Sequence, residues 1–188
     1  MKARFTIKQI IKQSAPVLIG VTLFSVITGR NLENSAELVT HHVPVLLVAL
    51  PAFINIAGDL ADVFCSRLSS ELYRGNLDSN FRPLRLFLAD LIGVLLVGIT
   101  SFIFVAIFAN IITDIIFGKI VSYLYLILIM VTAGVTATFV MMLVGAFLSR
   151  WAYLKGLDPD SIIAPITTTG GDMVGTTLLL FLASWILI

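Results

Sequence analysis

The sequence predicts an all-α integral membrane protein with five transmembrane helices. Of its 188 residues, 59 % are hydrophobic and 12 % are charged, and the mean hydropathy is +1.05. This is more apolar surface than a small soluble core can enclose, so the surrounding solvent is a lipid bilayer. A helix that rises about 1.5 Å per residue needs roughly 20 apolar residues to cross the hydrocarbon layer. The predicted spans are residues 14–28, 43–68, 84–112, 121–151 and 162–187.

Short polar breaks separate these spans and contain the Gly, Pro, Asn and Asp residues that are typical of turns. They leave no room for a soluble domain, so we expect one transmembrane domain over residues 1–188, with a short cytoplasmic segment at about 1–13. The basic N-terminus precedes an apolar run without a small-residue cleavage site, which favours a retained first helix over a signal peptide. The predicted breaks lie at residues 30–34, 73–78, 114–119 and 156–160.

Basic residues are distributed unequally between the two sides of the predicted membrane. Because Lys and Arg concentrate in cytoplasmic loops, the richer side is predicted to be cytoplasmic. The N-terminus is then inside and the C-terminus outside, which requires an odd number of spans. The poorer side carries Arg30 and Lys119, and the richer side carries ten: Lys2, Arg4, Lys8, Lys12, Arg67, Arg74, Arg82, Arg85, Arg150 and Lys155.

Two function classes have little support in the composition. The net charge is +1, and the basic residues are scattered between apolar runs, so no nucleic-acid surface is expected. A single cysteine, Cys65, cannot build a disulfide framework or a multi-thiolate metal site.

Aspartates inside the apolar spans are the first candidates for function, because a charge in hydrocarbon is costly and is seldom kept without a role. Asn55, Asp59 and Asp62 follow one another at i, i+4 and i+7 on the second span, so they share one helical face. We expect that face to point into the bundle. Counting from the helix ends places Asp59 and Asp172 at similar depth, where they could line one path. Asp90, near the cytoplasmic side, is expected to pair with a basic residue.

Carboxylate, amide and hydroxyl oxygens suit hard cations such as Mg²⁺. No His or Cys accompanies the aspartates, so the ligands that zinc and redox metals prefer are missing here, and the sequence does not favour such a site. His41 and His42 fall in the first outer loop and are interpreted as ordinary interfacial residues.

The last span opens with polar residues that do not suit a plain lipid-facing helix. Pro165 would free a backbone carbonyl one turn back, and Gly170 and Gly171 allow another backbone to approach. Thr168 and Thr169 could supply weaker oxygen ligands. The alternative, that these threonines and glycines only let helices pack, stays open at this point. The small residues of the fourth span are interpreted as packing alone: Ala133, Gly134, Ala137 and Thr138.

Two segments resemble the MgtE family and its animal solute-carrier relatives. The first runs from Pro51 to Asp59 and continues with Ser66-Arg67-Leu68, and the second runs from Asp158-Pro159-Asp160 to Gly171-Asp172. The resemblance implies a Mg²⁺ channel or transporter with a pore between two copies of a five-helix unit and Asp172 as its principal ion ligand. At Asp59 the family commonly has asparagine, which puts the local charge and ion preference in doubt. Bacterial members also carry cytosolic Mg²⁺-sensing domains, so their gating cannot be assumed here.

The sequence therefore predicts a multi-pass protein of the cell membrane, and not an enzyme, that forms a homodimer, the commonest oligomer. Two facing Asp172 carboxylates would attract protons as well as a cation, so transport should fall at acidic pH. Mg²⁺ is expected as the transported ion and not as a cofactor, with Mn²⁺ or Co²⁺ as alternatives. The predicted ligands are Asp172, Asp59, Asn55, Asp62, Thr168 and Thr169.

Two other function classes remain as alternatives. One is a metal-dependent intramembrane enzyme acting on lipids, since Asp59 and Asp62 precede Ser66-Arg67. The other is a structural membrane subunit. The sequence leaves open whether transport is passive or coupled to Na⁺ or H⁺, its direction, its selectivity and its gating, and the role of Asp90.

Overall fold

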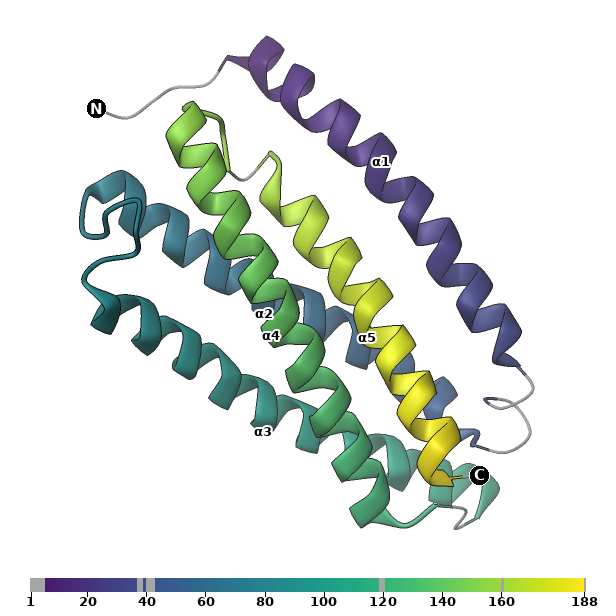
Figure 1. Cartoon of the computed structure of the whole chain (residues 1–188). Coiled ribbons are helices and arrows are strands. Elements are labelled where there is room, and N and C mark those ends of the chain that lie inside the picture. The colour runs from purple at the N-terminus through teal and green to yellow at the C-terminus, as the bar shows by residue number, and fades with distance from the viewer. Residues whose placement is uncertain (1–5, 37–38, 40–42, 119–120, 160, 188) are drawn as a thin grey trace.

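The computed structural model describes residues 6–36, 39, 43–118, 121–159 and 161–187, and the regular structure in these ranges is helical. Five helices are long and apolar enough to cross a membrane, which confirms the predicted fold class. Figure 1 shows them as a bundle of long helices. The helices are α1 (Ile7–Asn34), α2 (Val45–Arg74), α3 (Leu84–Phe117), α4 (Tyr123–Lys155) and α5 (Ile163–Leu187).

The first helix is longer at both ends than its predicted span of 14–28. It begins with a capping box, in which the Thr6 hydroxyl accepts from the Gln9 backbone N–H and the Gln9 side chain accepts from the Thr6 backbone N–H. The predicted break at 30–34 lies within the helix. Polar residues at a membrane surface stay helical until a cap ends the helix, so apolar length alone underestimated α1.

Glycines end three of the helices where the chain turns. Gly75 and Gly156 follow α2 and α4 with φ of 79° and 63°, the left-handed conformation that glycine adopts at low cost. Gly118 follows α3, so this helix extends to Phe117 and into the predicted break at 114–119.

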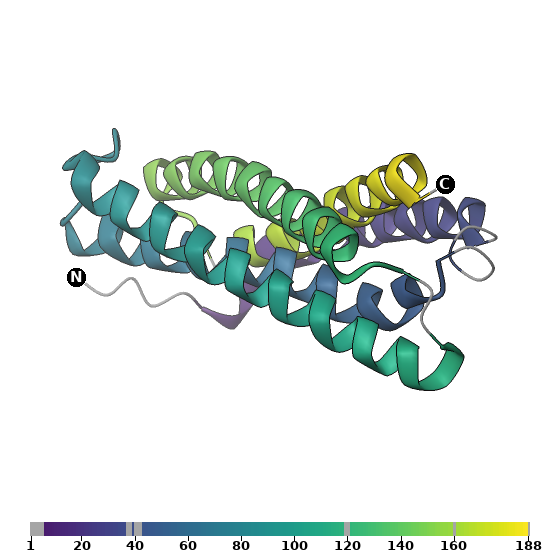
Figure 2. The same cartoon turned by 90° about the horizontal axis from the view of Figure 1, so that it is seen from below.

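The centre of the bundle is α2, which packs against α3, α4 and α5. In Figure 2, α2 and α3 form one layer, and α4 and α5 lie across it. Small residues on α4 permit this close packing, as predicted: Gly134 lies under the buried ring of Phe102, which in turn contacts the ring of Phe53 at 5.3 Å between centroids. Also buried on α4 are Ala133, Ala137 and Thr138.

The helix α1 packs mainly on α5 and contributes no buried residue to the core. Most of its large apolar side chains are exposed, where lipid would cover them. Gln13 ties its first half to the α4–α5 connection, because the Asp158 backbone N–H donates to the Gln13 side chain at 3.1 Å.

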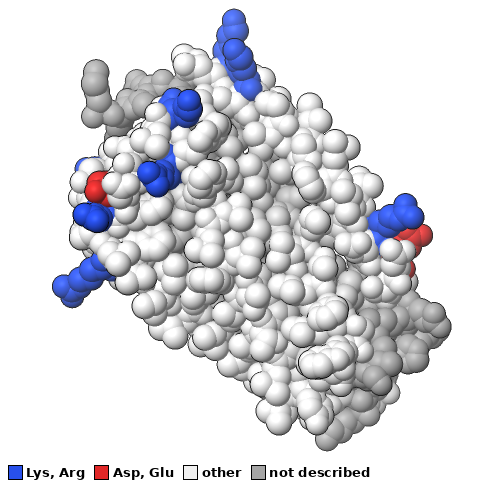
Figure 3. Space-filling view, viewed as in Figure 1, with Lys and Arg blue, Asp and Glu red and all other residues white. Residues whose placement is uncertain are grey.

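On the face shown in Figure 3, the charged side chains gather at the ends of the bundle, and none is visible across its middle. Most of the visible Lys and Arg side chains lie at the end that holds the start of α1, the α2–α3 connection and the α4–α5 connection. This is the side that the sequence predicts to be cytoplasmic. The orientation in the membrane stays a prediction.

Candidate functional site

The helices α2 and α5 touch backbone to backbone at two glycines. A Cβ atom added to Gly171 would lie 2.7 Å from Cα and 2.9 Å from N of Gly58. One added to Gly58 would lie 3.0 Å from Cα of Thr168. Real Cβ atoms essentially never come within 3.0 Å of backbone, so this distance requires glycine at position 171, whereas a Cβ at position 58 would require the backbone of Thr168 to shift by a few tenths of an ångström.

Each of these glycines is followed by an aspartate, so Asp59 and Asp172 both lie at the level of the crossing, one residue beyond the contact on their own helices. This agrees with the similar depth predicted from the sequence. Asp59 is exposed and Asp172 is partly buried, so both carboxyl groups can be reached from outside the protomer.

The polar face of α2 points out of the protomer, and the expectation that it points into the bundle is wrong for a single chain. Asn55 and Asp59 are exposed, and Asp62 is partly buried. The reason is that large and small apolar residues already occupy the sides of α2 that face α3, α4 and α5. They are fully buried: Phe53, Ala57, Ala61 and Phe64.

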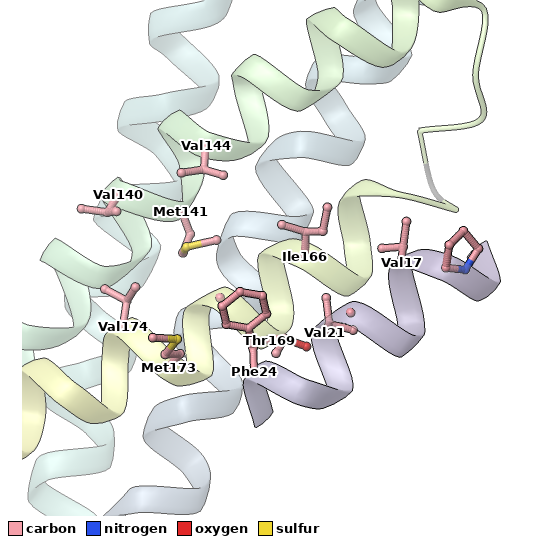
Figure 4. A pocket seen from close by; sticks show the side chains of 13 residues that line it. Val17, Val21, Phe24, Val140, Met141, Val144, Ile166, Thr169, Met173 and Val174 are labelled. Carbon is pink, nitrogen blue, oxygen red and sulfur yellow. The ribbon is translucent and has the colours of Figure 1, made fainter. Parts of the chain in front are cut away.

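The three threonines before Asp172 have different surroundings. Thr167 is buried and Thr168 lies against Gly58, and the Thr168 hydroxyl donates to the Ala164 carbonyl at 2.8 Å. That bond leaves its oxygen lone pairs available to a cation. Thr169 instead lines an apolar pocket of about 500 Å³ between α1, α4 and α5, next to Met173 and Phe24 (Figure 4). The structure thus brings Thr168, and not Thr169, to the α2–α5 crossing.

The motif that begins at Asp158 leads into the first turn of α5, which starts at Ile163. Pro165 lies in its first turn, where a backbone N–H has no partner within the helix in any case. Asp158 accepts a hydrogen bond from the Ser161 hydroxyl at 2.5 Å. Asp160, the second acidic residue of the motif, lies outside the described residues.

Asp90 has a basic partner, as predicted from the sequence. Its Oδ1 accepts from Nε of Arg67 at 2.8 Å, which joins α3 to α2. The second ion pair among the described residues joins Arg74 to Glu71. Neither of these two pairs involves Asp59 or Asp172.

Comparison with known families shows what kind of protein this is. The model of the MgtE family, described as a divalent cation transporter, matches residues 50–182, well over half of the chain. The chain belongs to the MgtE family. The matched range contains both glycine-aspartate pairs, and no curated protein matches the chain. This MgtE chain is accordingly a multi-pass membrane protein of a divalent cation transporter family.

The part of this MgtE domain that the structure describes contains no group of three or more His, Cys, Asp or Glu side chains arranged to hold a metal. His41 and His42 lie outside that part. At the crossing, one protomer contributes two carboxylates, those of Asp59 and Asp172. They are few for a fully coordinated ion, which prefers six or more oxygen ligands.

The sequence predicted a close backbone approach at Gly171, which the contact with Gly58 confirms, but it did not indicate Gly58 as the partner. The signal was present, because Gly58-Asp59 and Gly171-Asp172 repeat the same dipeptide on two different helices of the MgtE domain. Two glycines in apolar helices predict a close approach. Which glycine meets which could not be known without the register of α2 against α5.

Proposed function

We propose that this MgtE chain carries Mg²⁺ along a path at the interface of two copies, with Asp172 as the principal ligand. The observation that supports the proposal is the exposed polar face of α2, which lies beside Asp172 at the glycine crossing. Divalent cation transport itself follows from the family. The ion, its ligands and the dimer are the steps that the proposal adds.

The position of Asp59 argues for a covering partner. It lies near the middle of α2, in a helix that is long and apolar enough to span the bilayer. An ionised carboxylate facing lipid at that depth costs about 3 kcal/mol on insertion scales. A second copy related by a two-fold axis would remove this face from lipid and supply the same polar groups from the other side.

Dimerisation also provides the missing ligands. Two copies double the carboxylates of Asp59 and Asp172, and Asn55 and the Thr168 hydroxyl add neutral oxygens. Mg²⁺ dehydrates reluctantly and is held through one or two carboxylates with several waters retained, so a wide carboxylate-lined path fits it. Asp62, one turn towards the predicted cytoplasmic side, extends the path, and Thr169 would need to turn away from its apolar pocket to join.

A cross-linking experiment tests the dimer face. In a Cys65→Ala background, a cysteine is placed on the polar face by Ala52→Cys or Ser66→Cys, both exposed positions, and a bifunctional maleimide is added to protein in liposomes. Phe147→Cys, on the exposed side of α4, is the matched control. We expect a covalent dimer from one or both face positions and none from the control. Equal cross-linking from all three, or from the control alone, would contradict the proposal.

Competition identifies the ion. Mg²⁺ uptake into liposomes is followed with a Mg²⁺-sensitive dye while Mn²⁺, Co²⁺ or Ca²⁺ is added outside. We expect uptake of Mg²⁺ with partial competition from Mn²⁺ and Co²⁺, since all three accept oxygen ligands in octahedral geometry. Uptake of another divalent ion with no Mg²⁺ uptake would overturn the choice of Mg²⁺ but not the family function.

A further inference from the structure

The end of the bundle that holds the C-terminus contains a second polar cluster, far from the α2–α5 crossing. On α3, the Oδ1 atoms of Asn110 and Asp114 are both buried, and neither accepts a hydrogen bond from a described residue. Asn110 is 1 % exposed, so its free oxygen is enclosed by protein. A buried acceptor without a donor costs about 1–3 kcal/mol, so something is expected to satisfy both oxygens.

The two side chains point at the same short segment. Nδ2 of Asn110 donates to the Val121 carbonyl at 3.4 Å, and the Tyr123 hydroxyl donates to Oδ2 of Asp114 at 2.9 Å. Asn110 and Asp114 are also i and i+4 on one helix, where Cβ atoms are about 5–6 Å apart. The two unpartnered oxygens therefore belong to one small region between the end of α3 and the start of α4.

Among the described residues of this region, the negative charge of Asp114 has no basic partner. Asp114 lies in the last turn of α3, and that turn contains no basic residue. The end of a helix carries a partial negative charge, which makes a carboxylate there unfavourable. Neither ion pair among the described residues includes Asp114. A bound cation would offset the carboxylate, the helix end and the free amide oxygen together.

We propose that Asn110 and Asp114 bind a small monovalent cation, Na⁺, at the end of α3. Carboxylate and amide oxygens suit hard cations, and carboxyl-terminal helix ends coordinate Na⁺ in membrane transporters. A single carboxylate balances one positive charge, whereas Mg²⁺ would keep a net charge and demand a nearly octahedral set of ligands. The third side-chain ligand is the hydroxyl oxygen of Tyr123, at the start of α4.

This site is separate from the proposed Mg²⁺ path. Asp114 lies three residues before the end of α3 and Asp172 lies fifteen residues before the end of α5. The difference of twelve residues corresponds to about 18 Å along the bundle. A variant that abolishes ion binding at one of the two proposed sites should therefore leave binding at the other unchanged.

Two other occupants could satisfy the same oxygens. A water molecule could donate to both, and would show no dependence on the cation in the buffer. The ammonium group of Lys119, five positions beyond Asp114 in the sequence and outside the described residues, could neutralise the carboxylate internally. The experiment separates both from Na⁺.

Thermal unfolding of the full chain in detergent is compared in NaCl and in choline chloride at equal ionic strength, with EDTA present to remove divalent ions. We expect wild type to melt about 3 °C higher in saturating NaCl, because a ligand that binds only the folded state stabilises it. Asp114→Asn and Asn110→Ala should lose this difference. Glu33→Gln, which alters an exposed acid in the last turn of α1, and Asp172→Asn should keep it.

Hydrogen exchange gives a readout that needs no variant. Backbone amides of residues 110–118 and 121–126 should exchange more slowly in NaCl than in choline chloride, and amides of the α2–α3 connection should not change. Equal melting and equal exchange of wild type in the two salts would overturn the site and indicate water. A Na⁺ effect that appears only after Lys119→Met would assign the position to the lysine, and one lost only in Asp172→Asn would place the ion at the other site.

Discussion

Replacing Gly171 by alanine adds one methyl group at the crossing of α2 and α5. The new Cβ would lie 2.7 Å from Cα and 2.9 Å from N of Gly58, whereas carbon atoms in good contact are about 3.5–4.0 Å apart. The obstacle is backbone and cannot rotate away, so the two helices must separate by about 1 Å. Overpacking of this kind costs about 1–3 kcal/mol.

The loss should appear as a lower melting temperature of about 5 °C, because 1 kcal/mol shifts a domain of this size by about 2–4 °C. Transport should fall as well, since the displaced helix carries Asp172 at the next position. Gly58→Ala should be milder, because its Cβ would meet Cα of Thr168 at 3.0 Å and needs a smaller displacement.

The matched control is Gly20→Ala in α1, where an added Cβ would meet no atom within 4 Å. That variant should be as stable as wild type or slightly more stable, because alanine favours the helix over glycine by about 1 kcal/mol. Melting is measured by fluorescence-detected size exclusion after heating, and Mg²⁺ flux is measured at equal reconstitution. Unchanged melting of Gly171→Ala, or a larger loss in Gly58→Ala than in Gly171→Ala, would refute the backbone contact.

Three further predictions follow from the contacts described above. Arg67→Met should destabilise the protein by about 1 kcal/mol, because it leaves Asp90 unpaired. In a double-mutant cycle of melting temperatures, adding Asp90→Asn should recover part of this loss. If the second substitution recovers nothing, the two residues do not stabilise the fold as a pair. Cys65, which is 1 % exposed, should react with a maleimide only after denaturation, and rapid labelling of the folded protein would contradict its burial. Mg²⁺ flux should fall as pH drops through the acidic range, because protons compete with the cation for the Asp172 carboxylates. A flux that does not change with pH would contradict this competition.

Much of the fold could be predicted because apolar length and composition are properties of the sequence itself. Four of the five spans agree closely with α2 to α5, and the first was too short because polar residues continue α1 at both ends. The start of α1 depends on capping by Thr6 and Gln9, which hydropathy does not register. The number of spans was therefore predictable and their bounds at the membrane surface were not.

The candidate site was predicted in part. Helical periodicity placed Asn55 and Asp59 on one face, but whether that face points inward depends on which neighbours α2 meets. The apolar side of α2, with Phe53 and Phe64 fully buried, filled the interior and turned the polar side outward. Likewise, Asn110 and Asp114 became a site only when the start of α4 came against them, and their spacing at the end of an apolar helix was the one available signal.

The measurement that tests the central claim most directly is Mg²⁺ flux into liposomes containing purified protein. Wild type is compared with Asp172→Asn and Asp172→Ala at matched reconstitution, and Glu33→Gln serves as an acidic residue away from the path. The account predicts flux in wild type and in Glu33→Gln, and its loss in both Asp172 variants. Robust wild-type flux that neither Asp172 variant changes would contradict the assignment of Asp172 as the ligand.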